Sequence, residues 1–345
     1  MSIITGWLND RFGPRIVLTS CGVLSGIGYF LLSQISEVWQ FYLVFGIVIG
    51  AGSTIFVPMF STIARWFAKR RSMMSGIAAA GIGVGMLVMP LLVNSLILAY
   101  NWRTCSLVLG IAVFIIVVIA AQFMKRDPSS MNQIAYGEYK NQVNTATSGN
   151  SGITLKKATS SWQFWVFFGV LFCSGFSSFS LQIHIVPHII DSGISSTIAA
   201  TILAIVGGTS IIGQLGLGSA ADRLGNKQCF FIGLMLISLM IVWLLLNGEL
   251  WTLYLFAVIF GIGTGGNMTQ ESPTVAWLFG LAAHGSIFGL LAVGFTFGGS
   301  LGPVITGYLF DTTGNYNIAF LAAAVVGFIG AILVATLKSV RFDAS

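Results

Sequence analysis

The chain has 345 residues, of which 56% are hydrophobic and only 8% are charged, and its formal net charge is +6. Soluble globular proteins are about one quarter charged, so this chain has too few charged side chains to cover itself with a solvated surface. The composition excludes a water-soluble enzyme, a nucleic-acid-binding protein and a disordered scaffold. The basic residues are spread along the chain and form no concentrated patch of the kind that nucleic-acid binding requires.

Ten long segments are apolar and almost free of charge, and each can supply the roughly 20 helical residues that cross a bilayer core. The strands of a membrane barrel are about 10 residues of alternating polarity, and runs such as residues 111–121 do not alternate. We therefore predict an all-α polytopic membrane protein. The predicted spans are 16–36, 39–63, 73–98, 104–124, 162–189, 195–219, 228–247, 250–273, 286–309 and 317–337.

The basic residues predict the orientation in the membrane. If the turn at residues 10–15 is cytoplasmic, every Lys and Arg except Arg103 falls on the cytoplasmic side, where short loops rich in basic residues are retained. We expect an integral protein of a plasma membrane or a bacterial inner membrane, with the central loop and the C-terminus in the cytoplasm. The basic charge is thus a topology signal.

One motif, G-x-x-x-D-R-x-G-x-[RK], occurs twice at an offset of 212, and other pairs such as Gly76 and Gly289 recur at 213. The two copies consist of Gly6, Asp10, Arg11, Gly13 and Arg15, and of Gly218, Asp222, Arg223, Gly225 and Lys227. A repeat of this length predicts two copies of one structural unit. We predict an N-terminal helical bundle over 1–124, a polar cytoplasmic linker over 125–160 and a six-helix C-terminal bundle over 161–345.

The two predicted bundles are unequal. The second holds six spans, whereas the first holds four full spans, with room before Asp10 for only about 12 Å of helix. By the logic of the repeat, we expect about 30–50 further residues upstream, with one full span and most of another at about 20 residues each. An upstream reading frame that has a stop codon and encodes no such span would contradict this expectation.

The repeated motif, placed in a turn between two spans of both halves, resembles motif A of the major facilitator superfamily. The resemblance covers the whole chain and implies a twelve-helix fold, of which the first helix and most of the second are absent here. It also implies a secondary transporter whose two halves bind cargo near the membrane midplane and alternate access. It implies no enzyme activity, no cofactor and no metal. The phosphate-binding loop G-x-x-x-x-G-K-[ST] does not occur, which excludes pumping by ATP hydrolysis in this chain.

A narrower resemblance points to monocarboxylate porters and oxalate–formate antiporters. It is carried by the segments 65–71, 102–103 and 184–193. That branch commonly has an arginine four residues before the second motif A glycine, where this chain has Gln214, and the span 286–309 lacks the lysine of oxalate carriers. We therefore expect a monocarboxylate-type acid, moved by proton symport or by exchange for a counter-substrate through a monomer in the lipid bilayer. The alternatives are a carrier of a neutral solute or drug, and a transport-inactive remnant or receptor.

The motif A residues are candidates for gating. Asp10 and Asp222 can accept backbone N–H bonds or pair with an arginine such as Arg65, and Gly13 and Gly225 allow the tight turn. We interpret these contacts as a latch that holds the cytoplasmic ends of the halves together in one state. The alternative is that they only stabilise the turns and set the topology.

Polar residues within the spans are candidates for the transport site, because such groups are costly in a membrane and usually face a cavity. His184 and His188 share one helix face, and His184 is a candidate for substrate binding and proton coupling. Glu271 is a proton carrier if it faces the cavity, but we favour pairing with an arginine such as Arg223. The candidate substrate-binding residues are His184, Gln182, Gln214, Asn267 and Asn94. Hydrogen bonding between helices is the alternative role for each of them.

Overall fold

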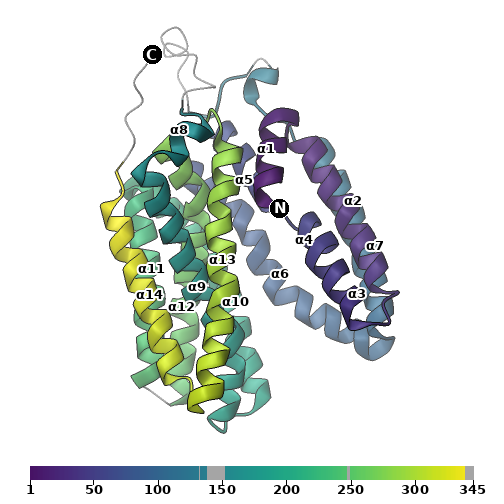
Figure 1. Cartoon of the computed structure of the whole chain (residues 1–345), viewed down its shortest axis with the longest axis vertical. Helices are drawn as coiled ribbons and strands as arrows, with labels where there is room; N and C mark the ends of the chain where they lie inside the picture. Colours follow the sequence, from purple (N-terminus) through teal and green to yellow (C-terminus); the bar gives the residue numbers. More distant parts are fainter. Residues whose placement is uncertain (132, 138–151, 247–248, 339–345) are drawn as a thin grey trace. The chain divides into compact units, whose positions relative to one another are not determined.

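The computed structural model describes residues 1–131, 133–137, 152–246 and 249–338 (Figure 1). In this part of the chain the regular secondary structure is helical, apart from two isolated β-bridges. Ten helical segments are long and apolar enough to cross a membrane, and each coincides with a span predicted from the sequence. The prediction of an all-α polytopic membrane protein is confirmed.

The first part of the chain contains one irregular span. The predicted span 39–63 is a composite of two short helices, a π-helical segment and a longer helix, because Pro58 lacks an N–H donor and several glycines lower the helix propensity of this stretch. The elements up to residue 123 are α1 (Ser2–Phe12), α2 (Pro14–Leu32), α3 (Val38–Leu43), η1 (Val44–Ile49), α4 (Gly50–Gly52), α5 (Phe56–Trp66), α6 (Arg71–Ala99) and α7 (Trp102–Phe123).

The second part consists of long, regular helices. Several of them pass the predicted ends of their spans, and α12 continues through Pro273 to Phe279. Membrane helices tolerate an internal proline when neighbouring groups satisfy the freed backbone carbonyl. The elements from residue 128 onward are η2 (Pro128–Met131), α8 (Leu155–Thr159), α9 (Trp162–Asp191), α10 (Ser196–Leu224), α11 (Asn226–Leu246), α12 (Leu250–Phe279), α13 (His284–Thr313) and α14 (Asn317–Thr336).

The chain forms two compact units, and each unit draws on separated segments. Unit 1 comprises Met1–Ala68, Val88–Gly152 and Gly280–Leu290, and unit 2 comprises Lys69–Leu87, Ile153–Phe279 and Leu291–Ser345. The first turns of α6 therefore belong to unit 2, and the first turns of α13 belong to unit 1. The boundaries 1–124, 125–160 and 161–345 stay a prediction, and residues 138–151 of the predicted linker lie outside the described residues.

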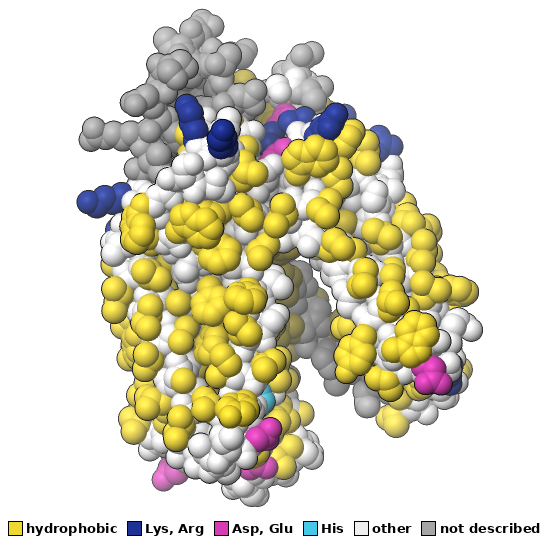
Figure 2. All heavy atoms as spheres, viewed as in Figure 1, with side chains coloured by type: hydrophobic (Ala, Val, Ile, Leu, Met, Phe, Trp, Pro, Cys, Tyr) yellow, Lys and Arg dark blue, Asp and Glu magenta, His cyan; other side chains and the backbone are white. Residues whose placement is uncertain are grey.

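The surface of each unit suits a lipid environment. Figure 2 shows hydrophobic side chains along the sides of the helices, while most of the visible Lys and Arg side chains lie toward one end of each unit. Large apolar side chains such as Ile116 in unit 1 and Ile332 in unit 2 are 66% and 64% exposed. Exposed apolar side chains in such numbers are costly in water and stable against lipid tails.

Small residues let the helices of unit 2 approach closely. A Cβ at Gly213 on α10 would overlap the backbone carbonyl of Ile262 on α12, and a Cβ at Gly265 on α12 would overlap that of Ser210 on α10. Without a hydrophobic driving force in lipid, helices associate through close packing of this kind. The α10–α12 pair is therefore the tightly packed centre of unit 2.

We expect Gly213→Ala to lower the apparent melting temperature of the purified protein by a few degrees, because overpacking costs about 1–3 kcal/mol. Gly216→Ala is the matched control on the same helix, since its Cβ would meet nothing within 4 Å and alanine favours the helix by about 1 kcal/mol. Thermal unfolding in detergent measures both variants. Equal melting temperatures for the two would show that the α10–α12 contact is not close-packed.

Candidate functional site

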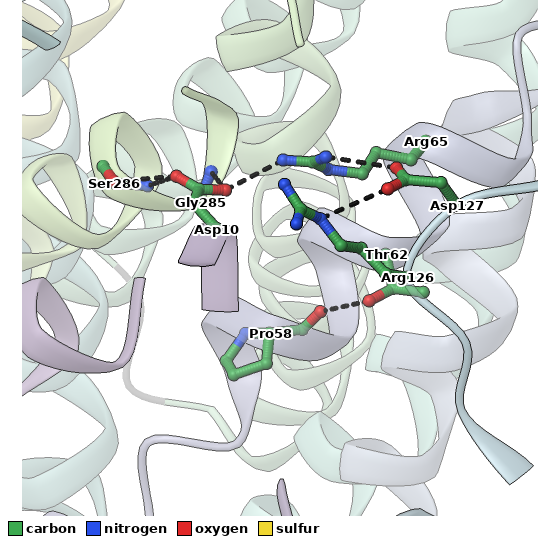
Figure 3. Close-up of polar contacts among 8 residues, drawn as sticks. All are labelled: Asp10, Pro58, Thr62, Arg65, Arg126, Asp127, Gly285 and Ser286. Carbon is green, nitrogen blue, oxygen red and sulfur yellow. Dashed lines mark hydrogen bonds and ion pairs between the residues drawn. The ribbon is translucent and has the colours of Figure 1, made fainter. Parts of the chain in front are cut away.

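Asp10 caps a helix that is distant in the sequence. It lies in the last turn of α1, and its carboxylate accepts hydrogen bonds from the first turn of α13, within unit 1 (Figure 3). The amides of Gly285 and Ser286 donate to Oδ1 and Oδ2 at 3.1 and 2.7 Å, and the Ser286 hydroxyl donates to Oδ2 at 2.7 Å. A helix N-terminus presents unpaired N–H groups and a partial positive charge, so it stabilises a carboxylate.

Arg65 joins Asp10 to a second acid. Its Nη2 donates to Oδ1 of Asp10 at 2.9 Å, and its Nη1 donates to Oδ1 of Asp127 at 3.1 Å (Figure 3). The Arg65 side chain is only 4% exposed, and partners of opposite charge offset the cost of removing a buried arginine from water. The Arg65–Asp10 pair expected from the sequence is present. The part played by Asp127 was not predicted.

Asp222 repeats the arrangement of Asp10 in unit 2. It lies in the last turn of α10, and its Oδ1 and Oδ2 accept from the amides of Ser72 and Met73 in the first turn of α6, each at 3.0 Å. The Ser72 hydroxyl also donates to Oδ1 of Asn226 at 2.8 Å. Ser72 and Met73 stand 213 positions before Gly285 and Ser286, so the two caps use equivalent backbone atoms of the repeat.

Glycines make both caps possible. Gly13 and Gly225 end α1 and α10 with φ of +83° and +99°, a conformation that side chains disfavour. A Cβ at Gly6 would overlap the carbonyl of Gly285, and a Cβ at Gly218 would lie 3.0 Å from the carbonyl oxygen of Ser72. The motif A glycines thus set the turn and bring each acid close to its helix N-terminus.

Three other basic residues of the motif anchor the turns to neighbouring groups. Arg15 donates from Nε to Oε1 of Gln122 on α7 at 2.9 Å. Lys227 donates to the carbonyls of Ala335 and Leu337 at 2.7 and 2.9 Å. Arg11 instead stacks over the aromatic ring of Trp7, with 5.3 Å between Cζ and the ring centroid. These contacts stabilise each copy of the turn.

A cavity of about 60 Å³, lined by both apolar and polar side chains, lies within unit 2. Every residue that lines it is uncharged, and its walls come from α6, α9, α10, α12 and α13. Three of the five predicted substrate-binding residues, Gln182, Gln214 and Asn267, are brought together here. The other polar side chains in the wall are Ser174, Ser178, Ser210 and Thr264.

The two buried amides of the cavity have different surroundings. Gln214 is 1% exposed, and its Oε1 has no hydrogen-bond partner among the described residues. The amide of Asn267, oriented to satisfy both neighbours, donates to the carbonyl of Phe230 at 3.0 Å and accepts from the amide of Leu234 at 3.3 Å. Asn267 therefore joins α12 to α11, whereas Oε1 of Gln214 is left without a partner among the described residues.

Ser174, Ser178 and Gln182 occupy positions i, i+4 and i+8 of α9 and form one polar stripe on that helix. Residues at this spacing share a helix face. Gln182 was predicted from the sequence and the two serines were not, although three polar residues at this spacing in an otherwise apolar span are a recognisable pattern.

The predicted histidines lie outside the wall of this cavity. The Nε2 atom of His184 forms a hydrogen bond with the carbonyl of Pro303 on α13 at 3.0 Å, and the ring packs against Tyr316. The His188 ring packs edge-on against Tyr316 and Phe320. The helix–helix contact that was the alternative role of His184 is thus present, and its role in proton coupling stays a prediction.

Tyr316, in the turn before α14, lies between the rings of Phe310 and Phe320, with centroids 4.2 and 5.1 Å away. Burial, followed by the charges of Asp191 and Asp311, raises the pKa of the Tyr316 phenol. The phenol therefore stays protonated at pH values at which a solvated tyrosine begins to ionise. It is a neutral neighbour for the histidines.

Glu271 is 2% exposed on α12 and lies one helical turn beyond Asn267. The helical spacing puts it on the face of α12 that also carries Thr264 and Met268, two residues of the cavity wall.

The expected pairing of Glu271 with Arg223 does not occur in the described part of the chain, where Arg65 and Arg126 supply the ion pairs. The reason is that Glu271 is buried and Arg223 is exposed at the end of α10. The Asn94 side chain lies outside the described residues.

Within the described residues, ten apolar helices, a duplicated acidic cap and an uncharged cavity define a polytopic helical membrane protein. The chain belongs to the Major Facilitator Superfamily, whose family model matches residues 1–218 and 167–343. It is therefore an integral membrane transporter and not an enzyme.

Several known proteins resemble the chain. Monocarboxylate transporter 13 of Bos taurus is 25% identical over 96% of this chain and 75% of its own length, and monocarboxylate transporter 12 of Xenopus laevis is 26% identical over 92% and 73%. Among solved structures, the E. coli fucose:proton symporter FucP has a TM-score of 0.75 at 14% identity, covering 98% of this chain and 87% of FucP. The human organic anion transporter MFSD10 has a TM-score of 0.74 at 15% identity, covering 96% and 80%. These two structures establish the fold.

Proposed function

We propose that the protein is a secondary transporter of a small monocarboxylate-type organic acid, driven by proton symport or by exchange. The observation that carries the proposal is the uncharged cavity of unit 2, whose Gln214 acceptor has no partner in the part of the chain that the structure describes. An unpaired carboxylate in a membrane cavity is costly, so the acid needs an accompanying proton there. The monocarboxylate transporters among the relatives support the same substrate class.

The cavity suits a small monoacid in size and hydrogen bonding. Its volume of about 60 Å³ has room for roughly four to six water-sized groups, at 10–15 Å³ each. Oε1 of Gln214 accepts from a hydroxyl or a protonated carboxyl, and the hydroxyls of Ser174 and Ser178 donate to the carbonyl oxygen. Each such bond contributes about 1 kcal/mol, which favours the weak binding that a carrier needs to release its cargo.

The accompanying proton has two candidate positions in addition to the acid itself. Glu271 is buried on the helix that carries Asn267, on the same face as the cavity wall. The ring of His184 contacts the Pro303 carbonyl instead of the cavity. We therefore assign to Glu271 the role of taking up the proton and passing it to the bound acid, and keep His184 as the alternative.

The two acidic caps form the proposed latch. Asp222 holds the first turn of α6 in unit 2, and Asp10 holds the first turn of α13 in unit 1. Since both helices continue into the other unit, releasing a cap frees the start of a helix that the two units share. The caps form on the side that the basic residues predict to be cytoplasmic, in a plasma membrane or a bacterial inner membrane. Motif A thus closes that side in one state and opens it in the other.

A carrier of neutral solutes is the second candidate, because the same uncharged lining accepts a neutral polar molecule. Lactate and its amide, lactamide, distinguish the two functions, since they have nearly the same shape and differ in the acidic group. A neutral-solute carrier takes up lactamide at a rate that is independent of pH and shows little uptake of lactate.

We expect lactate uptake into proteoliposomes to be several-fold faster at external pH 5.5 than at 7.5, because each lactate enters with one proton. Gln214→Leu is expected to raise the half-saturating lactate concentration about fivefold, the equivalent of one hydrogen bond of about 1 kcal/mol, without changing the pH ratio. Lactamide uptake measured in parallel is the control. Lactate uptake that does not respond to pH would contradict proton coupling.

A further inference from the structure

A second cavity, of about 600 Å³, opens within unit 2 where α10 ends and α6 begins. Three cations line it, Lys69 and Arg70 before α6 and Arg223 near the end of α10, together with Asp222. All three basic side chains are exposed. This pocket is separate from the cavity described above, and they share no lining residue.

The cations of this pocket lack acidic partners within the described residues. Both carboxylate oxygens of Asp222 accept from the amides of Ser72 and Met73, and the ion pairs of the described residues involve Arg65 and Arg126. The pocket therefore presents clustered positive charge to a ligand. Lysine and arginine in such a cluster match the geometry and charge of a phosphate group.

The internal repeat shows that the acidic cap does not require these cations. At an offset of 213, Ala282 and Ala283 stand where the second copy has Lys69 and Arg70. The cap at Asp10 nevertheless forms with the equivalent amides. The counterpart of Arg223 is Arg11, which stacks on Trp7. Lys69 and Arg70 are thus not required for the acidic cap, which in the other copy forms with alanines at these positions and with Arg65 as its cation.

Two exposed apolar side chains are near residues of the pocket in the sequence. Ile77, one turn after Met73 on α6, is 49% exposed, and Leu224, which follows Arg223, is 57% exposed. A free phosphate gains nothing from such groups, whereas a phospholipid places acyl chains against them while its headgroup meets the cations. Basic pockets between helices on the cytoplasmic side are suited to anionic headgroups.

We propose that the pocket formed by Lys69, Arg70 and Arg223 binds the phosphate of an anionic phospholipid headgroup. The pocket lies on the side that the charge distribution predicts to face the cytoplasm, where anionic lipids attract basic residues. Lipid binding at this pocket does not depend on transport activity, so it can be tested independently of the proposed function.

The test measures binding of phosphatidylglycerol and phosphatidylcholine to the purified protein in detergent by native mass spectrometry. We expect wild type to bind phosphatidylglycerol at least tenfold more tightly than phosphatidylcholine. The triple variant Lys69→Gln, Arg70→Gln, Arg223→Gln should lose at least tenfold in phosphatidylglycerol affinity, since each cation contributes about fivefold. The matched control removes three exposed basic side chains elsewhere, by Lys125→Gln, Lys156→Gln and Lys157→Gln, and should lose less than threefold.

Two results would overturn the proposal. One is an equal loss of phosphatidylglycerol affinity in the triple variant and the control, which would show that the lipid affinity depends on the net charge of the protein and not on this pocket. The other is displacement of the lipid by inorganic phosphate at the same concentration, which would make the pocket a site for free phosphate. The single variant Lys69→Gln, which changes one exposed side chain before α6, should lose about fivefold and provides the test if the triple variant does not fold.

Discussion

Replacing Asp10 or Asp222 with asparagine is expected to reduce transport about tenfold or more while the protein still reaches the membrane. Each carboxylate accepts two backbone amides at a helix N-terminus, and hydrogen bonds to a charged group are worth about 1.5–3 kcal/mol against about 1 kcal/mol for a neutral one. Losing this difference shifts the balance between the capped and released states by roughly tenfold. A carrier that spends most of its time in one state completes few cycles.

The measurement is lactate uptake normalised to the amount of protein in the proteoliposomes. Asp311→Asn is the control, because Asp311 is an exposed acid in the last turn of α13, away from both caps. We expect the control to retain most of the wild-type rate. Wild-type uptake in both Asp10→Asn and Asp222→Asn would show that motif A in this chain has a structural role and no role in gating.

The two caps are also expected to respond differently to the loss of a neighbouring arginine. Arg65 reinforces the cap at Asp10 through the 2.9 Å pair, whereas the ion pairs formed by the described residues leave Asp222 without an equivalent. The two copies of the repeat therefore cap equivalent helix N-termini, but they differ in the side chains that pair with the capping acid. Only one of the two caps depends on a buried ion pair.

The spans could be predicted from the sequence because their cause is local. Long uncharged segments must be helical in lipid, so ten helices follow from composition alone. The π-helical segment at 44–49, which interrupts the second span, was harder to predict from the sequence. There, glycines and Pro58 weaken the regular pattern, but where the helix changes its hydrogen bonding depends on its neighbours.

The candidate site could be predicted only in part. The repeat identified Asp10 and Asp222 and the glycines of their turns, since these residues are close in sequence. Their partners at Gly285 and Ser72 lie 275 and 150 residues away, and only the folded chain brings them together. The offset of 213 links Gly285 to Ser72, but it does not indicate which acid each of them meets.

The residues of the cavity could also be predicted only in part. Gln182, Gln214 and Asn267 were recognisable as polar residues within apolar spans. The sequence could not separate a residue that bonds a neighbouring helix from one that faces cargo, because both roles use the same side chains. In the structure Asn267 bonds to α11 while Oε1 of Gln214 is left without a partner in the described part of the chain.

Glu271→Gln is expected to abolish proton-driven accumulation of lactate while leaving lactate exchange intact. An ionised carboxylate within a membrane span is costly unless a partner neutralises it, and no ion pair of the described residues involves Glu271. A proton taken up on one side and released on the other is then the neutralising partner. Glutamine keeps the size and much of the hydrogen bonding of the acid but does not exchange a proton.

The measurement compares lactate accumulation in proteoliposomes at external pH 5.5 and internal pH 7.5 with counterflow at equal pH. One proton per lactate across two pH units supports an accumulation of at most about 100-fold, which wild type should approach and Glu271→Gln should lose. His184→Gln is the parallel variant and should retain accumulation, because the His184 ring contacts the Pro303 carbonyl outside the cavity wall. Loss of accumulation in His184→Gln alone would assign the coupled proton to His184 instead of Glu271. Accumulation that survives in both variants would place the proton on the acid itself and leave Glu271 a structural role in α12.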